Sequence, residues 1–218
     1  MAPKAGIFVS NAFKVAGSAL ESDFVKDLKA ALDYGVDIFN LSVTTRAKRI
    51  LRLLGFEAWL TLLSEQRPDA VCVVAAGNDN SSEKFWPAAY SSDPVFGDRT
   101  VSVGALAADW RSWASFSNHG SWVKVYAPGR DLVNAYATGT YECQDAPYTG
   151  QLRDFYGMAK WSGTSFSTPI VSGLIAARMS RAAVTAREAA ESLLADAEKQ
   201  EMPGVGSILL PYRNKFDI

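Results

Sequence analysis

The chain has 218 residues, of which 48% are apolar, and it carries 22 Lys and Arg against 23 Asp and Glu. This length and composition are typical of one globular domain, large enough to form its core without disulfides or a structural metal. The balanced charge excludes a protein that binds nucleic acid or anionic membranes through a broadly basic face. No apolar stretch approaches the ~20 residues that a membrane-spanning helix needs.

Apolar runs and helical repeats alternate along the chain. Runs that suit strands buried on both faces of a sheet occur at 5–10, 36–42, 70–76, 100–105 and 123–127. Apolar residues at helical spacing predict helices at 24–34, 47–66, 165–181 and 185–199. This alternation predicts an α/β fold in three layers, a mostly parallel sheet with helices on both faces, within one domain.

Local signals refine these elements. Ser22 or Asp23 is placed to cap the first helix, and Gly35 stands where a left-handed residue would end it. Pro169 is expected among the first four positions of its helix, whose amides have no helical partner. Residues 135–162 are rich in Gly, Tyr and Thr and show little periodicity, which predicts a long functional loop.

The first chemical motif is Ala-Ala-Gly-Asn at 75–78, where a strand is expected to end. Open α/β sheets bind ligands outside the carboxyl ends of their strands. The small residues there would let a substrate backbone approach, and the Asn78 carboxamide would be able to donate a hydrogen bond to an oxyanion. Taken alone, these residues are more commonly explained by a plain Gly-Asn turn.

The second motif, Gly-Thr-Ser-Phe-Ser-Thr-Pro at 163–169, places Ser165 at or next to the N-terminus of a helix. Free amides and the helix dipole favour negative charge there, so Ser165 is a candidate nucleophile. Serine is also a common helix cap, and the residue type alone leaves both explanations open.

Together these motifs, their order and their flanks resemble the subtilisin-like serine peptidase family (peptidase S8). The resemblance covers nearly the whole chain. Further segments match in order: MAPKA at 1–5, VDIFNLS at 36–42, WPAAY at 86–90, VSVGA at 101–105, SFSNHG at 115–120 and YAPG at 126–129. The related sedolisin family shares the Gly-Thr-Ser motif but is expected to have an acidic residue in place of Asn78, which favours the subtilisin branch.

The resemblance implies roles for individual residues. Ser165 would attack the scissile carbonyl, while Asn78 and the Ser165 amide would hold the oxyanion. Phe85 would lie near the floor of the first specificity pocket, where its bulk predicts a preference for small side chains. A bound peptide would add as a strand between two cleft walls. These walls would be Leu41, Ser42 and Val43 on one side and Ala75, Ala76 and Gly77 on the other.

The Asp and His motifs of the family do not occur in the chain, which contains neither Asp-Ser/Thr-Gly nor His-Gly-Thr-His. In the family both precede the segment that residues 1–5 resemble. A serine hydroxyl without a base is a weak nucleophile. The expectation is that residues 1–218 form a partial peptidase domain with its amino-terminal portion missing. A separate amino-terminal half that supplies Asp and His is the less favoured alternative.

Other polar residues have structural explanations. His119, the only histidine, corresponds to a turn in the family and is expected to be solvated or packed, and Lys160 is a still weaker candidate base. Cys72 and Cys143 are expected to be free thiols. No acidic spacing singles out a calcium site, and neither a metal nor a cofactor is expected.

The functional prediction is a serine-type endopeptidase that cleaves peptide or protein substrates through an acyl-enzyme on Ser165. The alternative is a catalytically inactive relative that binds peptides or a partner protein in the same cleft. The first residues lack the features of a signal peptide. The family favours an extracellular or cell-surface location.

Overall fold

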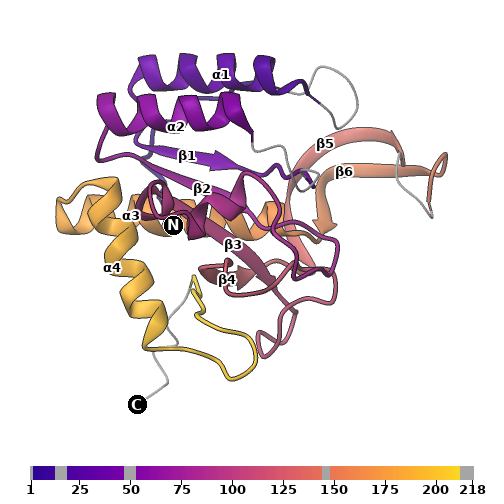
Figure 1. Ribbon diagram of the computed structural model, residues 1–218. Helices are drawn as coiled ribbons and strands as arrows, with labels where there is room; N and C mark the ends of the chain where they lie inside the picture. The colour runs from indigo at the N-terminus through magenta and orange to yellow at the C-terminus, as the bar shows by residue number, and fades with distance from the viewer. Residues whose placement is uncertain (1, 13–18, 47–52, 144–147, 212–218) are drawn as a thin grey trace.

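The structure is a computed structural model that describes residues 2–12, 19–46, 53–143 and 148–211 (Figure 1). Its centre is a four-stranded sheet in which neighbouring strands run parallel in the order β1-β2-β3-β4. The prediction of an α/β fold with a parallel sheet is confirmed. The strands are β1 (Ile38–Leu41), β2 (Val71–Ala75), β3 (Thr100–Leu106) and β4 (Val125–Pro128).

Helices cover both faces of this sheet (Figure 1). α1 (Glu21–Tyr34) and α2 (Leu54–Gln66) pack on one face, and α3 (Thr164–Ala182) and α4 (Ala186–Glu198) pack on the other. Two short 3-10 helices, η1 (Ala88–Ser92) and η2 (Gly97–Arg99), join β2 to β3. No helix among the described residues is long and apolar enough to cross a membrane.

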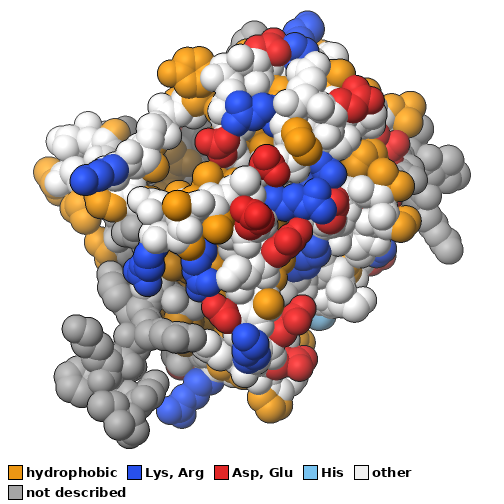
Figure 2. All heavy atoms as spheres, turned by 90° about the vertical axis from the view of Figure 1, so that its left-hand side faces the viewer, with side chains coloured by type: hydrophobic (Ala, Val, Ile, Leu, Met, Phe, Trp, Pro, Cys, Tyr) orange, Lys and Arg blue, Asp and Glu red, His pale blue; other side chains and the backbone are white. Residues whose placement is uncertain are grey.

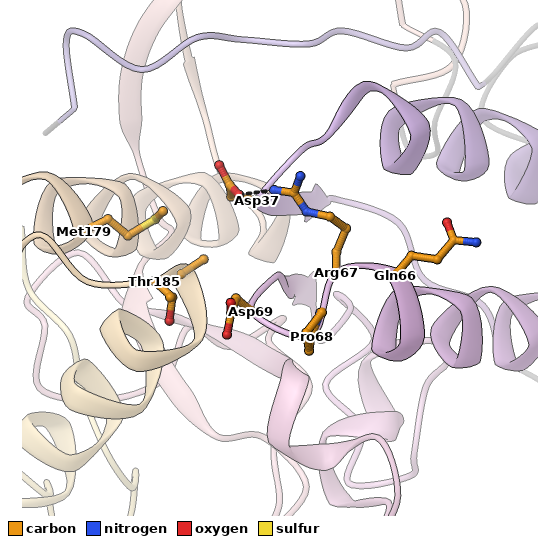
Figure 3. Close-up of a pocket in the computed structure, with 8 residues that line it drawn as sticks. Asp37, Gln66, Arg67, Pro68, Asp69, Met179 and Thr185 are labelled. Atoms are coloured by element: carbon orange, nitrogen blue, oxygen red, sulfur yellow. Dashed lines mark hydrogen bonds and ion pairs between the residues drawn. The ribbon is translucent and has the colours of Figure 1, made fainter.

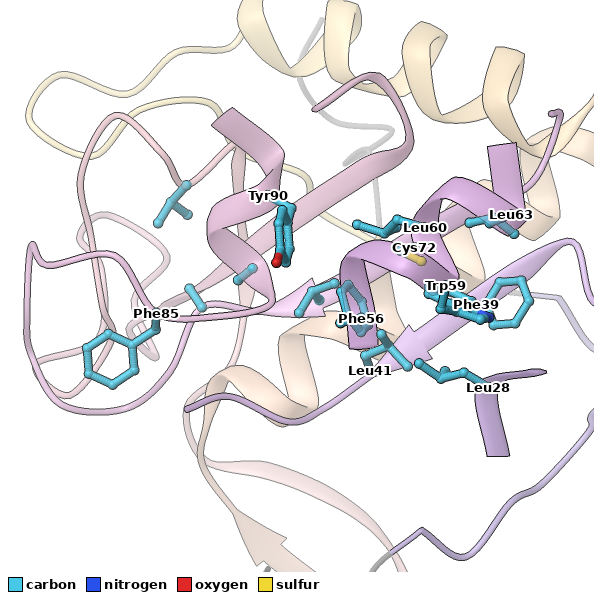
Figure 4. Close-up of a cluster of buried hydrophobic side chains, with 14 of the residues drawn as sticks. Leu28, Phe39, Leu41, Phe56, Trp59, Leu60, Leu63, Cys72, Phe85 and Tyr90 are labelled. Atoms are coloured by element: carbon cyan, nitrogen blue, oxygen red, sulfur yellow. The ribbon is translucent and has the colours of Figure 1, made fainter. Parts of the chain in front are cut away.

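The core is divided by the sheet into two apolar clusters. Alternate side chains of β2 enter opposite clusters: Val71 and Val73 face α3 and α4, whereas Cys72 and Val74 face α1 and α2. Both sets are fully buried, which explains the unbroken apolar run in the sequence. The cluster below α1 and α2 is the aromatic one (Figure 4), and its largest buried side chains include Phe56, Trp59 and Tyr90.

The strand predicted at 5–10 is not formed. This segment has no regular structure, and the Ile7 and Val9 side chains are 83% and 81% exposed. A strand is stabilised by its neighbours, and none of the described strands pairs with residues 5–10. The apolar pattern therefore identified a segment suited to a sheet, but pairing decides whether the strand forms.

The prediction of a long loop at 135–162 is also wrong. β5 (Leu132–Glu142) and β6 (Leu152–Trp161) form an antiparallel hairpin that projects beyond one end of the parallel sheet (Figure 1). Because both strands are mostly exposed, they lack the apolar alternation that reveals a half-buried strand. Cross-strand aromatic contacts stabilise such a hairpin. Four rings have centroids between 4.7 and 6.5 Å apart: Tyr136, Tyr141, Phe155 and Trp161.

Helix ends follow the predicted positions in part. Gly35 ends α1 in the left-handed conformation, with φ of 92°. Neither Ser22 nor Asp23 caps this helix, because it already begins at Glu21. The Glu21 side chain instead accepts a hydrogen bond from the Phe56 amide at 3.0 Å, which joins α1 to the first turn of α2. The predicted helix at 47–66 is found from residue 54, while 47–52 lie outside the described residues.

Candidate active site

Three segments meet at the carboxyl-terminal end of the parallel sheet: the exits of β1 and β2, and the start of α3. Ser42 follows β1 and hydrogen-bonds to Ser165 in the first turn of α3. Asn78 follows β2 and hydrogen-bonds to Thr164. The structure therefore brings the two predicted catalytic residues, Ser165 and Asn78, to the same helix end.

Ser165 is the second residue of α3, and Gly163 is the N-cap. Gly163 has φ of 154°, a conformation that favours glycine, and no side chain caps the helix. Capping therefore does not explain the serine. Its hydroxyl lies 3.4 Å from the Ser42 carbonyl oxygen, and Ser165 is only partly buried. Its own amide belongs to the first turn, where helix amides have no partner within the helix.

The Asn78 carboxamide is held by Thr164. The Thr164 amide and hydroxyl donate to Asn78 Oδ1 at 2.9 and 3.0 Å. With Oδ1 engaged in this way, the Nδ2 group is the end of the carboxamide that can donate to a bound ligand. Asn78 is exposed, so a ligand can reach it.

The loop that carries Asn78 is shaped by the buried side chain of Asn118. Asn118 Nδ2 donates to the Ala76 carbonyl at 2.9 Å, and Oδ1 accepts from the Asp79 and Ser81 amides. Gly77 has φ of 107°, and a Cβ there would lie 2.4 Å from Asn118 Nδ2. Only glycine fits both the backbone conformation and the close approach. Sequence reasoning did not identify the roles of Asn118 and Thr164, although both lie in segments that it singled out.

The predicted specificity residue, Phe85, is 3% exposed and lies on the loop after β2 (Figure 4). A short bridge between Thr45 and Trp86 joins this loop to the segment after β1. Phe85 Cδ1 and Thr44 Oγ1 are 3.2 and 3.3 Å from the position that a Gly77 Cβ would occupy. The Arg46 guanidinium lies over the Phe85 ring at 5.2 Å. The space next to Gly77 is therefore narrow.

The residues predicted to line the cleft differ in exposure. Ser42 and Val43 are partly exposed. The side chains of Leu41, Ala75 and Ala76 are buried, so these positions can present only main-chain atoms to a ligand. Beside the start of α3, Tyr136, Tyr141, Trp161 and Phe166 help to line a hollow of about 190 Å³, which suits an apolar group.

Among the described residues, the Ser165 hydroxyl hydrogen-bonds to no imidazole, amine or carboxylate. The His119 ring stacks on Trp113 with centroids 4.6 Å apart, and the His119 amide donates to the Ser81 carbonyl. Lys160 is exposed on β6 opposite Val133. Within the described ranges, no group of three His, Cys, Asp or Glu is arranged to hold a metal ion.

A second hollow, of about 270 Å³, lies at the other end of the sheet (Figure 3). The segments that lead into β1 and β2 form one wall, where Arg67 pairs with Asp37. Figure 2 shows acidic and basic side chains interspersed over this end of the molecule. Their ion pairs include Arg178 with Asp196 and Arg187 with Asp98. This mixed surface and the candidate active site are separated by the length of the strands.

The parallel α/β sheet, with a serine at a helix N-terminus and an asparagine at the neighbouring strand exit, is the arrangement that the resemblance to subtilisin-like serine peptidases predicts. The chain belongs to the Subtilase family (peptidase S8), which it matches over residues 1–208.

Characterised relatives include a thermophilic serine proteinase from Bacillus sp. (strain AK1), 33% identical over 81% of this chain, and thermitase from Thermoactinomyces vulgaris, 28% identical over 88%. The chain spans 36% and 58% of the lengths of these two relatives.

Solved structures confirm the fold. A cold-adapted subtilisin-like serine proteinase aligns over 91% of this chain and 64% of its own length, with a TM-score of 0.67 and 21% identity. The prenylagaramide maturation protease PagA aligns over 84% of this chain and 60% of its own length, with a TM-score of 0.63 and 25% identity.

Proposed function

We propose that this chain is the nucleophile-bearing part of a serine endopeptidase, with Ser165 as the nucleophile and Asn78 as an oxyanion donor. The observation that carries the proposal is the junction of α3 with the exit of β2, where Thr164 holds Asn78 beside Ser165 in a member of the Subtilase family. The Asn78 carboxamide is exposed, and the Ser165 hydroxyl does not cap the helix. A free hydroxyl with a hydrogen-bond donor next to it suits acyl transfer.

The reaction proceeds in two steps. Ser165 Oγ attacks the scissile carbonyl carbon while a base takes its proton, and the carbonyl oxygen becomes an oxyanion that Asn78 Nδ2 and the Ser165 amide stabilise. Collapse of this intermediate breaks the C–N bond, and the protonated base gives its proton to the leaving amine. Water then attacks the ester on Ser165 in the same way and releases the acid.

The base and its orienting carboxylate come from a segment outside residues 1–218. This part of the proposal is supported by the Ser165 hydroxyl, whose partner among the described residues is the Ser42 carbonyl. It is also supported by the lengths of the relatives, which exceed the part that this chain matches. The same polypeptide, extended upstream, is the first place to find an Asp and a His.

The substrate class is a peptide with a small residue before the scissile bond. Phe85 and Thr44 both approach the surface next to Gly77, and Arg46 covers the Phe85 ring. A side chain entering between these residues meets an aromatic floor that is already packed. Glycine, alanine and serine fit such a space, whereas a large aromatic side chain does not.

The test is labelling with a fluorophosphonate probe, which reacts with an activated serine, read out by mass spectrometry. It is applied to residues 1–218 and to the protein extended by the reading frame encoded upstream. Labelling of Ser165 in the extended protein alone is the expected result. An upstream frame without Asp and His motifs, or a folded extended protein that does not label, would overturn the proposal and leave a peptide-binding relative without activity.

A further inference from the structure

A proline interrupts the hydrogen-bond ladder of α3 directly behind the nucleophile. In an α-helix, the amide of residue 169 donates to the carbonyl of residue 165. Proline has no amide hydrogen, and Pro169 is the sixth residue of α3 rather than one of the first four as predicted. The Ser165 carbonyl therefore has no donor from its own helix at this position.

The hydroxyl of Ser42 takes the place of the missing amide. Ser42 Oγ donates to the Ser165 carbonyl oxygen at 3.0 Å. In the reverse direction, Ser165 Oγ lies 3.4 Å from the Ser42 carbonyl oxygen. The two serines, which are 123 residues apart in the chain, thus form a reciprocal pair between the exit of β1 and the first turn of α3.

Ser42 is itself held by polar groups that also join β1 to α3. Asn40 Nδ2 donates to Ser42 Oγ at 3.4 Å, and the Ser172 hydroxyl lies 2.9 Å from Asn40 Oδ1. Ser172 lies on α3, close to the Thr168 carbonyl. A hydroxyl supported on both sides has a defined direction, which is what a substitute for a backbone donor requires.

We propose that Ser42 is a positioning residue, whose hydroxyl replaces the absent Pro169 amide and so fixes the direction in which Ser165 Oγ leaves the helix. This inference rests on the proposed function of Ser165 as a nucleophile. The Ser42 hydroxyl acts through the Ser165 carbonyl and not on the reacting atoms. Because small displacements of a nucleophile reduce reaction rates strongly, loss of this bond slows acylation more than it weakens the fold.

Two substitutions and their combination test the proposal. Ser42→Ala removes the donor, whereas Pro169→Ala restores an amide at the position where the helix would supply one. Pro169 is exposed, so its replacement leaves no cavity. In the upstream-extended protein, we expect Ser42→Ala to slow fluorophosphonate labelling of Ser165 about tenfold. The double variant is expected to recover most of this rate, and Pro169→Ala alone to change it little.

Ser91→Ala is the matched control, because the Ser91 hydroxyl also donates to a buried carbonyl, that of Trp122, far from Ser165 in the chain. It is expected to lower the urea midpoint without slowing labelling. An unchanged labelling rate in Ser42→Ala contradicts the proposal. A double variant that labels as slowly as Ser42→Ala also contradicts it. So does a Ser42→Ala variant whose labelling rate falls no further than that of the Ser91→Ala control.

A second readout separates this inference from the proposed function. Hydrogen exchange in residues 1–218, followed by mass spectrometry, reports the protection of the first turns of α3 whether or not Ser165 is activated. We expect the amide hydrogens in the first turns of α3 to exchange faster in Ser42→Ala than in the parent. Adding Pro169→Ala is expected to reverse this change. If the extended parent protein does not label at all, the proposed function fails, and the exchange measurement still decides whether Ser42 holds this helix end.

Discussion

Thr164 donates twice to one oxygen atom of Asn78, through its amide at 2.9 Å and its hydroxyl at 3.0 Å. Its hydroxyl also accepts a hydrogen bond from the Gly77 amide at 3.1 Å. One threonine therefore joins the exit of β2 to the start of α3, and it orients the carboxamide that the proposed reaction requires.

Replacing Asn78 by alanine is expected to lower kcat of the upstream-extended peptidase by about 100- to 1000-fold, the loss that this kind of change produces in subtilisin. Thr164→Val keeps the amide bond to Asn78 but removes the hydroxyl bond, so about a tenfold loss is expected. Steady-state kinetics on a peptide substrate separates the two effects. A variant Asn78→Ala whose KM rises while kcat is unchanged would show that Asn78 binds substrate without stabilising the oxyanion.

Gly77→Ala is expected to destabilise the fold by about 2 to 4 kcal/mol, because the new Cβ would lie 2.4 Å from Asn118 Nδ2 in a backbone conformation that alanine disfavours. Urea unfolding measures the change. Gly150→Ala is the matched control: Gly150 also has a positive φ, 82°, but a Cβ there would meet no atom within 4 Å. Equal losses at both positions would show that the backbone conformation, and not the contact with Asn118, accounts for the effect.

The sequence predicted the parallel sheet because apolar runs, of which β2 is the unbroken one, alternate with helical repeats along the chain. It also placed Ser165 and Asn78 together, since strand exits and a helix start share one edge of such a sheet. It failed at 5–10 and 135–162 for opposite reasons. Residues 5–10 carry a strand pattern without a described partner, whereas the hairpin strands pair with each other and pack their aromatic rings without an alternating apolar pattern.

The supporting contacts of the site were not predictable from local pattern. Asn118 and Thr164 bind to loops 37 to 87 positions away, and a single sequence contains no signal for such pairs. The predicted position of Pro169 in the helix was wrong. The helix begins one residue earlier than predicted, and the proline lies beyond its first four positions. The absent amide of Pro169, wherever the helix starts, is what leaves the Ser165 carbonyl to Ser42.

Phe85→Ala is expected to widen the residue preference at the position before the scissile bond, from small side chains toward larger apolar ones. Removal of the ring opens the space that it shares with Thr44 next to Gly77. A peptide library digested by the extended protein, with cleavage sites read by mass spectrometry, measures the change. A parent enzyme that already prefers large aromatic residues would contradict the proposed role of Phe85.

Thr100→Val is expected to leave stability unchanged or to raise it by about 1 kcal/mol. Thr100 is fully buried at the start of β3, and its hydroxyl has no hydrogen-bond partner among the residues that the structure describes. Valine has the same shape without the unsatisfied polar atom, and it favours strands. Urea unfolding measures the effect. A loss of more than 1 kcal/mol would show that the hydroxyl has a partner in solution.

Glu188 is expected to contribute stability that depends on pH. Hydrogen bonds from the Thr185 amide and hydroxyl at the start of α4 lower the pKa of the Glu188 carboxyl below its ordinary value of 4.5. A carboxyl whose pKa is lower in the folded state stabilises the fold above its unfolded pKa, and this contribution disappears as the pH falls through the folded pKa.

Glu188→Gln removes the charge while keeping an acceptor for the Thr185 amide. We therefore expect a lower urea midpoint than the parent at pH 7, and a difference that shrinks as the pH falls through the lowered pKa of the Glu188 carboxyl. Glu198→Gln is the matched control, because this residue ends the same helix, where a negative charge opposes the helix dipole. Its urea midpoint is expected to equal or exceed that of the parent at pH 7. A Glu188→Gln deficit that stays constant across the whole acid titration of the parent would assign the contribution to the shape of the cap rather than to its charge.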